Sequence, residues 1–401
     1  MTTKTKRIPL FLIVLYVVYS LYYFADMNTS ANTMVKQTES RSDVHVYLIV
    51  LIVLLGVFFL SRGKWRLEDP FRLSFLFMIV WTVVVDLIVG AQFWGTATHV
   101  GLLTLFYLIY FWAANYINTS RLYNLVLCAE CILWIITIWY AIQAYFAFRE
   151  YNGEDVDIVL NMSYNVLVFM PVLLQIKKRA LKLPMVTISV LYIVVSLKRG
   201  AIITLLAMIF VYAMMSDKKK GIKTMQIDQK KAGKVIISLA AIAVLIIVVD
   251  DQMGGALSAR FTLDALRYGS SRNELYSAAW NDVKTRGILF FLLGKGSGSS
   301  LQIIGSGVHN EILEFLFSYG LVGAMMYVVV VFNGAKRGAW LRNISSTSGR
   351  TFTMGMTYVV LVGVFGSALF SHMTFHIMLA MGMANSAGCE IADGRLPDGQ
   401  Q

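Results

Sequence analysis

The chain has 401 residues, of which 57% are hydrophobic and only 14% are charged, and its formal net charge at pH 7 is +12. Soluble domains carry about 25% charged residues, so this composition excludes a soluble globular protein and predicts an integral membrane protein. With only three cysteines, the composition also excludes a disulfide framework, and for the Cys128–Cys131 pair, inside an apolar segment, it favours helix packing over redox or metal chemistry.

Hydrophobic segments recur along the whole chain. A membrane-spanning helix needs roughly 20 mostly apolar residues. About twelve segments approach this length, near 8–25, 44–61, 73–91, 97–115, 122–148, 159–176, 183–197, 201–215, 235–249, 311–333, 352–370 and 372–388. The first has no small-residue cleavage site, so it predicts a spanning helix rather than a removed signal. We therefore expect an all-α polytopic protein in which residues 1–401 form a single transmembrane domain.

The distribution of lysine and arginine predicts the orientation. If the N-terminus is cytoplasmic, 24 of the 35 basic residues lie in cytoplasmic loops, including seven lysines from Lys218 to Lys234. Both termini are then cytoplasmic. The net positive charge reflects orientation and contact with anionic membrane lipids, and it gives no indication of nucleic-acid binding.

Eight of the remaining basic residues lie in two places on the outer side. Lys198 and Arg199 stand in the hairpin SLKRGAII, and six others lie in the polar segment 250–310. A cation at the bilayer edge is costly, and it persists where it pairs or contacts an anionic ligand. Snorkelling to lipid headgroups is the alternative. Two cationic clusters on one face favour an anion-binding site, and we interpret 250–310 as an extracytoplasmic catalytic loop.

A helix along the membrane surface is predicted within this loop. Leu275, Ala279 and Val283 recur at helical spacing, and Ser270 or Ser271 is a suitable N-cap. Arg272 then stands in the first turn, where a bound anion gains from both the helix dipole and the guanidinium. Two further cations are candidate substrate-binding residues, with a solvated surface as their alternative role: Arg260 and Arg267.

The run LGKGSGSS follows at 293–300. It lacks the Gly-Lys-Ser/Thr spacing and the preceding strand of a phosphate-binding P-loop. Its glycine content favours a flexible connection over the site.

His309 stands where the chain becomes apolar again. An imidazole, with an unperturbed pKa near 6.5, accepts or holds a proton in neutral medium, so we expect His309 to face a substrate. Asn310 and Glu311 have the character of helix-start residues. Glu314 can meet His309 only through a local irregularity. Asn310 and Glu314 are included as candidate substrate-binding residues.

Four other ionisable residues fall near or inside apolar segments. His372 and His376 have i,i+4 spacing, but no third ligand is evident nearby, which favours packing over a metal site. Asp86 and Glu130 give only a weak indication of a transport path. We expect neither a metal nor another cofactor.

Taken together, SLKRGAII, SRNELYSAAW, the G-K-G-S-G run and HNEILEFLFSYGLVG resemble the O-antigen ligase and Wzy-type polymerase superfamily of bacterial membrane glycosyltransferases. The resemblance covers roughly residues 185–335. The family often has adjacent Ser-Arg, whereas Leu197 and Lys198 intervene here before Arg199.

The resemblance implies a GT-C-like fold in the bacterial cytoplasmic membrane and a metal-independent transfer on its outer face. In the implied reaction, a glycan carried on undecaprenyl diphosphate moves onto another lipid-linked repeat unit. By this resemblance, Arg199 and Arg272 would bind the diphosphate, and His309 would orient or deprotonate the accepting hydroxyl or contact the diphosphate. A chain-length regulator and a flippase are the implied protein partners.

Three other functions stay open. A ligase that delivers the glycan to lipid A-core shares these motifs. A lipid-linked glycan transporter predicts internal repeats, and none is evident. A peptidoglycan polymerase of the SEDS type uses an outer-loop aspartate, for which Asp264 and Asp282 are available.

Overall fold

The structure is a computed structural model of the chain. It describes residues 69–117, 120–152, 162–215, 229–252, 254–259, 261–262, 272–371 and 374–394. The first two expected spans, near 8–25 and 44–61, lie outside the described residues.

The described part of the chain is helical. Its main elements are α3 (Pro70–Val89), α4 (Phe93–Tyr116), α5 (Ser120–Asn152), α6 (Met162–Leu167), α7 (Met170–Leu173), α8 (Arg179–Val195), α9 (Arg199–Met214), α10 (Gln229–Gln252), α11 (Ala256–Ala259), α13 (Arg272–Thr285), α14 (Ile288–Leu293), α15 (Ser299–Ile304), α16 (Glu311–Ile344), α17 (Ser346–Phe365) and α18 (Thr374–Ala392).

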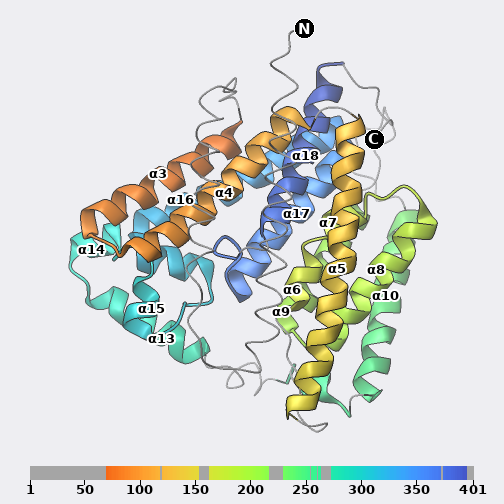
Figure 1. Cartoon of the computed structure of the whole chain (residues 1–401), viewed down its shortest axis with the longest axis horizontal. Coiled ribbons are helices and arrows are strands. Elements are labelled where there is room, and N and C mark those ends of the chain that lie inside the picture. Colours follow the sequence, from red (N-terminus) through yellow and green to blue (C-terminus); the bar gives the residue numbers. More distant parts are fainter. Residues whose placement is uncertain are drawn as a thin grey trace.

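Two groups of helices flank a central pair. Figure 1 shows α3, α4 and α16 on one side, α5, α8 and α10 on the other, and α17 and α18 between them. Extensive packing joins α16 to α17, α18 to α4, and α17 to α9. The short helices α13, α14 and α15 gather at one end of the first group (Figure 1). This arrangement brings the hairpin before α9 and the segment before α16 to the same end of the molecule.

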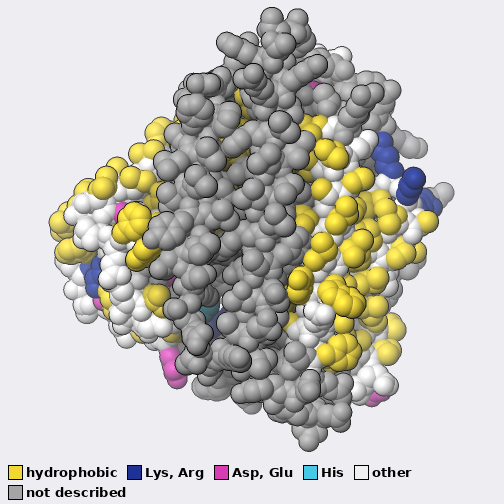
Figure 2. Space-filling view, viewed as in Figure 1, with side chains coloured by type: hydrophobic (Ala, Val, Ile, Leu, Met, Phe, Trp, Pro, Cys, Tyr) yellow, Lys and Arg dark blue, Asp and Glu magenta, His cyan; other side chains and the backbone are white. Residues whose placement is uncertain are grey.

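Within the described residues, four helices are long and apolar enough to cross a membrane: Pro70–Val89, Phe93–Tyr116, Leu122–Phe146 and Glu311–Ile344. Two shorter apolar stretches, Met162–Leu173 and Arg199–Met214, accompany them. Large hydrophobic side chains on their outward faces are exposed, among them Phe77, Trp139 and Phe332. Hydrophobic side chains also cover much of the described surface that is visible in Figure 2. Such a surface suits lipid rather than water, so the protein is a multi-pass membrane protein.

One expected span is divided. The segment predicted near 159–176 forms α6 and α7, which are separated by a turn at Val168 and Phe169. Pro171 lies in the first turn of α7. Proline has no backbone N–H and its ring clashes with the carbonyl four residues earlier, so one continuous helix is disfavoured here.

The ends of α3, α16 and α18 that lie far from His309 are joined by a buried charged cluster. The Asp69 carboxylate accepts a hydrogen bond from the Tyr110 hydroxyl at 3.0 Å and lies 3.5 Å from Arg72 and 3.7 Å from Arg337. Arg337 also donates to Asn385 at 2.7 Å. We call this the Asp69 end of the bundle.

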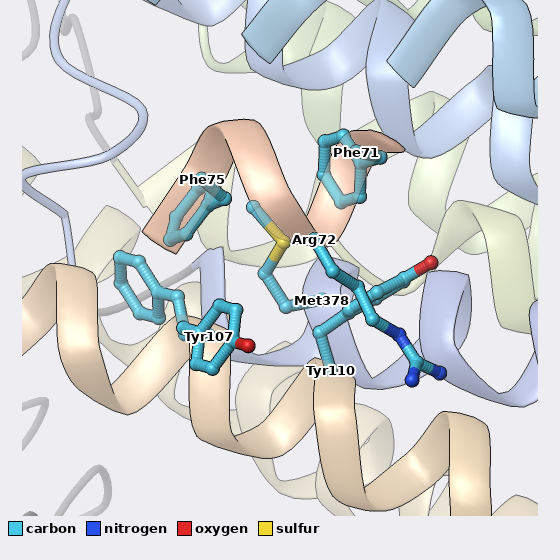
Figure 3. A pocket seen from close by; sticks show the side chains of 7 residues that line it. Phe71, Arg72, Phe75, Tyr107, Tyr110 and Met378 are labelled. Atoms are coloured by element: carbon cyan, nitrogen blue, oxygen red, sulfur yellow. The ribbon is translucent and has the colours of Figure 1, made fainter. Parts of the chain in front are cut away.

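A small pocket lies beside this cluster, between α3, α4 and α18. Figure 3 shows the aromatic side chains of Phe75 and Tyr107 facing each other near Met378. The pocket has no room for a water molecule. It is therefore a packing feature of the core and not a substrate site.

Helix α16 is broken at Gly320, where φ is 68° and ψ is −171°. A Cβ atom at this position would lie 2.2 Å from the Leu292 carbonyl oxygen, so only glycine fits. The break exposes carbonyl groups that other segments then satisfy: Arg286 Nη1 donates to Phe317 at 2.7 Å, and Gly296 N donates to Ser318 at 2.7 Å. A broken helix is tolerated at membrane depth only where such donors are supplied.

The glycine-serine run packs closely against the helices around it. Ser297 donates from its backbone N to Asp86 Oδ1 at 2.7 Å and from its hydroxyl to Asp86 Oδ2 at 2.5 Å. Its hydroxyl also lies 2.7 Å from that of Tyr319. We expected a flexible connection from the glycine content; instead these glycines let the backbone approach α3 and α16 closely.

Candidate functional site

Cationic residues from two distant parts of the chain meet around His309. Arg272 is the first residue of α13, and Lys198 is the N-cap of α9. The charges of both act on the His309 imidazole. Three residues that the sequence analysis selected separately are therefore brought together in space. We call Lys198, Arg272 and His309 the cationic site.

The backbone around His309 has the local irregularity that the sequence required for Glu314 to approach it. His309 adopts a left-handed conformation, with φ of 55°. Beyond it, Asn310 caps α16 by accepting a hydrogen bond from Leu313 N at 3.1 Å. Glu314 then turns back and accepts from Val308 N at 3.0 Å. Asn310 and Glu311 are thus helix-start residues, as predicted.

The Glu314 side chain fixes the backbone turn that carries His309. It is 4% exposed, and its carboxylate also accepts hydrogen bonds from Ser300 at 2.7 Å and Ser318 at 3.0 Å. Three protein donors therefore surround this carboxylate, which fixes the turn that carries His309. A direct contact between Glu314 and a substrate stays a prediction.

The electrostatic environment of His309 favours the neutral imidazole. Partial burial lowers the pKa of His309 below 6.5, the charges of Arg272 and Lys198 lower it further, and the charge of Glu314 opposes them. Burial and neighbouring cations both disfavour the protonated form. His309 is therefore neutral at pH 7 and carries a lone pair that can accept a proton.

The N-terminus of α9 faces this region as well. Lys198 has no acceptor with which to cap the helix, and its side chain makes no capping hydrogen bond. Arg199 follows as the first helical residue and is half-buried. A helix N-terminus with two adjacent cations is suited to an anion, because dipole and side-chain charges have the same sign.

Tyr164 is a member of this region that sequence reasoning missed. The Lys198 ammonium lies 5.8 Å from the centre of its ring, and the charge of Arg272 acts on its hydroxyl. The hydroxyl packs against Gly200, where a Cβ atom would lie 2.3 Å from it. The sequence offered one indication, the glycine directly after the Lys-Arg pair, but nothing pointed to a partner 36 residues earlier.

A buried carboxylate, that of Glu311, links the start of α16 to neighbouring segments next to the cationic site. Glu311 is fully buried, accepts a hydrogen bond from the Tyr327 hydroxyl at 3.2 Å, and accepts another from the backbone N of Leu369. It therefore joins the start of α16 to the turn after α17. Phe365, the last residue of α17, packs close to Gly200, so this turn lies beside the N-terminus of α9.

Asp282 forms ion pairs with two basic side chains. Its carboxylate lies 2.5 Å from Arg286 and 2.8 Å from Lys295. Burial raises the pKa of Asp282, but hydrogen bonds and charges from Lys295 and Arg286 outweigh it, and the net pKa is lowered. Because Arg286 also binds the carbonyl of Phe317, the ion pairs tie α13 to the broken segment of α16.

The two ionisable residues in apolar segments have protein partners. Asp86 binds Ser297, as described above. Glu130 lies 2.9 Å from His376 Nδ1, and both side chains are fully buried. His372 lies outside the described residues.

Other candidate residues also lie outside the described part of the chain, namely Arg260, Arg267, Ser270, Ser271 and Asp264. Within the described part, no group of three or more His, Cys, Asp or Glu side chains is arranged to hold a metal ion.

Comparisons with known proteins add no relative. No protein-family profile matches the chain, and no curated protein matches it.

Proposed function

We propose that the protein is a polysaccharide repeat-unit polymerase, which transfers a glycan from undecaprenyl diphosphate onto another lipid-linked repeat unit. The observation that carries this proposal is the convergence of Arg272 and Lys198 on a neutral His309. A glycosyl transfer from a lipid diphosphate needs cations for the leaving group and an acceptor for the hydroxyl proton, and these residues supply both.

The proposed reaction breaks the bond between the anomeric carbon of the donor and the diphosphate oxygen. The acceptor hydroxyl oxygen forms the new bond to that carbon, and its proton passes to His309. The leaving diphosphate gains negative charge, which Arg272, Lys198 and Arg199 stabilise. Such fixed charges are effective because they need no reorganisation during the reaction. Arg272 is suited to bidentate binding of a phosphate.

In this scheme a bound anion also raises the pKa of the base, His309. The charges of Arg272 and Lys198 lower the pKa of His309. A bound diphosphate neutralises part of their field, which raises the affinity of His309 for a proton. Proton acceptance is then favoured when the donor is in place.

The proposal includes a GT-C-like fold with about twelve spans, both termini in the cytoplasm, and the cationic site on the outer face of the bacterial cytoplasmic membrane. The position of the cationic site supports this placement, because it lies far from the Asp69 end of the bundle and carries cations that the predicted orientation leaves outside. Undecaprenyl-linked glycans and membrane lipids are the proposed ligands. A chain-length regulator and a flippase are the proposed partners. No cofactor is included.

Glycan profiling of a deletion strain tests the proposal. We expect the wild-type gene to restore high-mass polymer, and His309→Ala to leave single repeat units with normal export. Loss of all glycan from lipid A-core, with long chains retained on the carrier lipid, would identify a ligase instead. An unchanged glycan profile would argue for a transporter. Chelator treatment of wild-type membranes should leave polymer formation intact if the transfer is metal-independent.

A further inference from the structure

The Tyr164 hydroxyl is a buried polar group without a hydrogen-bond partner among the described residues. Burying a hydroxyl that lacks a partner is unfavourable, so such groups are rare and call for an explanation. Tyr164 belongs to α6, which contributes none of the three residues of the cationic site. Its hydroxyl lies against Gly200 in the first turn of α9, two residues after Lys198.

The surroundings of this hydroxyl suit the donation of a hydrogen bond to an anion. Lys198 lies 5.8 Å from the ring centre, and the charge of Arg272 acts on the hydroxyl. Both neighbours are cations with no acceptor atoms, so neither can accept the phenolic hydrogen. An acceptor that binds between them must be negatively charged or strongly polar. A phosphate oxygen is an acceptor of this kind.

Gly200 makes this approach possible. A Cβ atom at position 200 would lie 2.3 Å from the Tyr164 hydroxyl oxygen and 2.8 Å from Cβ of Phe365. The absence of a side chain lets the hydroxyl reach the first turn of α9. The N-terminal dipole of α9 adds a further attraction for an anion at the same place.

We propose that Tyr164 is a diphosphate-binding residue, whose hydroxyl donates a hydrogen bond to an oxygen of the lipid diphosphate held by Lys198 and Arg272. This inference rests on the proposed function and extends its binding site to α6. Tyr164 recognises the phosphate rather than the glycan.

Tyr164→Phe separates binding from folding. The substitution removes only the hydroxyl, and because this group has no described partner, the variant should keep or exceed the Tm of the wild type. A hydrogen bond to a charged group is strong enough that its loss should weaken binding by about 10-fold to 100-fold. A structural tyrosine would show the opposite pattern, with reduced stability.

The experiment measures equilibrium binding of undecaprenyl diphosphate to the full-length protein in detergent, together with Tm. Wild type, Tyr164→Phe and Arg272→Ala are compared, with Tyr107→Phe as the matched control. Tyr107 is a buried tyrosine that lines the pocket near the Asp69 end. We expect weaker binding by Tyr164→Phe and Arg272→Ala, and wild-type binding by Tyr107→Phe.

The possible results separate this inference from the proposed function. Wild-type affinity in Tyr164→Phe, with weak binding in Arg272→Ala, would overturn the role of Tyr164 and leave the proposed function standing. Weak binding in Tyr164→Phe together with a lowered Tm would indicate a structural role and also overturn it. If wild type does not bind the lipid diphosphate, or Arg272→Ala binds it normally, both the site and the inference are wrong.

A second pair of variants tests the approach of the hydroxyl. Gly200→Ala should displace the Tyr164 hydroxyl and weaken binding of undecaprenyl diphosphate. Gly233→Ala is the control, because a Cβ atom at that helical glycine meets nothing within 4 Å. Unchanged binding by Gly200→Ala would contradict the placement of the hydroxyl at the anion.

Discussion

Leu197 and His309 share a left-handed backbone conformation, with φ values of 53° and 55°, and they are the non-glycine residues with positive φ among the described residues. Leu197 directly precedes Lys198, and His309 lies within the field of that lysine. The left-handed region costs a residue with a Cβ atom roughly 1–2 kcal/mol. Such strain gathers at functional sites, where the surrounding structure imposes it. Two of the three residues of the cationic site, Lys198 and His309, are therefore held next to or within an unfavourable turn.

This backbone determines how His309 should be tested. Asparagine tolerates the left-handed region better than most residues, so His309→Asn removes the imidazole and keeps the turn. We expect polymer formation to fall at least 100-fold in His309→Asn, the lower range for loss of a general base. Its Tm should match the wild type more closely than that of His309→Ala. Polymer yield per unit of membrane protein is the measurement, and full activity of His309→Asn would exclude proton transfer by His309.

Arg272 is expected to bind the diphosphate through two parallel hydrogen bonds. Arg272→Ala should reduce polymer formation by about 10²–10³-fold, as the loss of one preorganised charge does. Arg272→Lys should stay impaired, because lysine offers a point charge without the fork geometry. Arg199→Ala should also lose activity. Lys284→Ala, an exposed position on the same helix α13, is the control and should polymerise normally. Normal activity of both Ala variants in the site would refute the assignment.

The pH profile of kcat/KM follows from the lowered pKa of His309. A base is active when deprotonated, so activity should persist as the pH falls through 6.5 and decline only below it. Lys198→Gln removes a cation that lowers this pKa, so its acidic limb should move to higher pH. Lys284→Gln should leave the limb in place. A limb that moves to lower pH in Lys198→Gln would contradict the electrostatic coupling.

Asp282 is expected to support stability rather than chemistry. Asp282→Asn leaves the nearly buried Arg286 without its carboxylate, and we expect a loss on the order of 2 kcal/mol, below the about 3–5 kcal/mol for a fully buried pair. Because the pKa of Asp282 is lowered from 3.8, its contribution is present above that pH and is lost as the pH falls through the folded-state pKa. Thermal unfolding of both forms from pH 7 to 3 measures this. Lost activity at an unchanged Tm would instead favour a catalytic aspartate.

The glycine-serine run is expected to need its glycines for close packing. Gly296 has φ of +86°, and a Cβ atom there would lie 2.6 Å from Val89 Cγ2. Gly296→Ala should therefore lower Tm and disturb the Asp86–Ser297 contact. Gly307→Ala is the control, because nothing lies within 4 Å of a Cβ atom at that position. Equal Tm values for the two variants would mean that the run is as flexible as its composition suggests.

Some properties follow from the sequence directly. The excess of apolar residues makes a membrane protein unavoidable, because no soluble fold could cover that much hydrophobic surface. Residues that cap or begin a helix were also predictable, since capping depends on neighbours in the chain: Asn310 caps α16, and Arg272 begins α13. The number of spans is less certain from sequence, because a break such as that before Pro171 depends on packing as well as on composition.

The composition of the site was decided by tertiary structure. Lys198, Arg272 and His309 could be selected singly, since each is a polar residue at the edge of an apolar segment. Their convergence, the partners of Glu314 and the position of the Tyr164 hydroxyl depend on how α6, α9, α13 and α16 pack. The sequence by itself determined the membrane class and the candidate cations, because both depend on local composition. The fold alone determined which charges share one field, because electrostatic interactions depend on distance in space and not on separation along the chain.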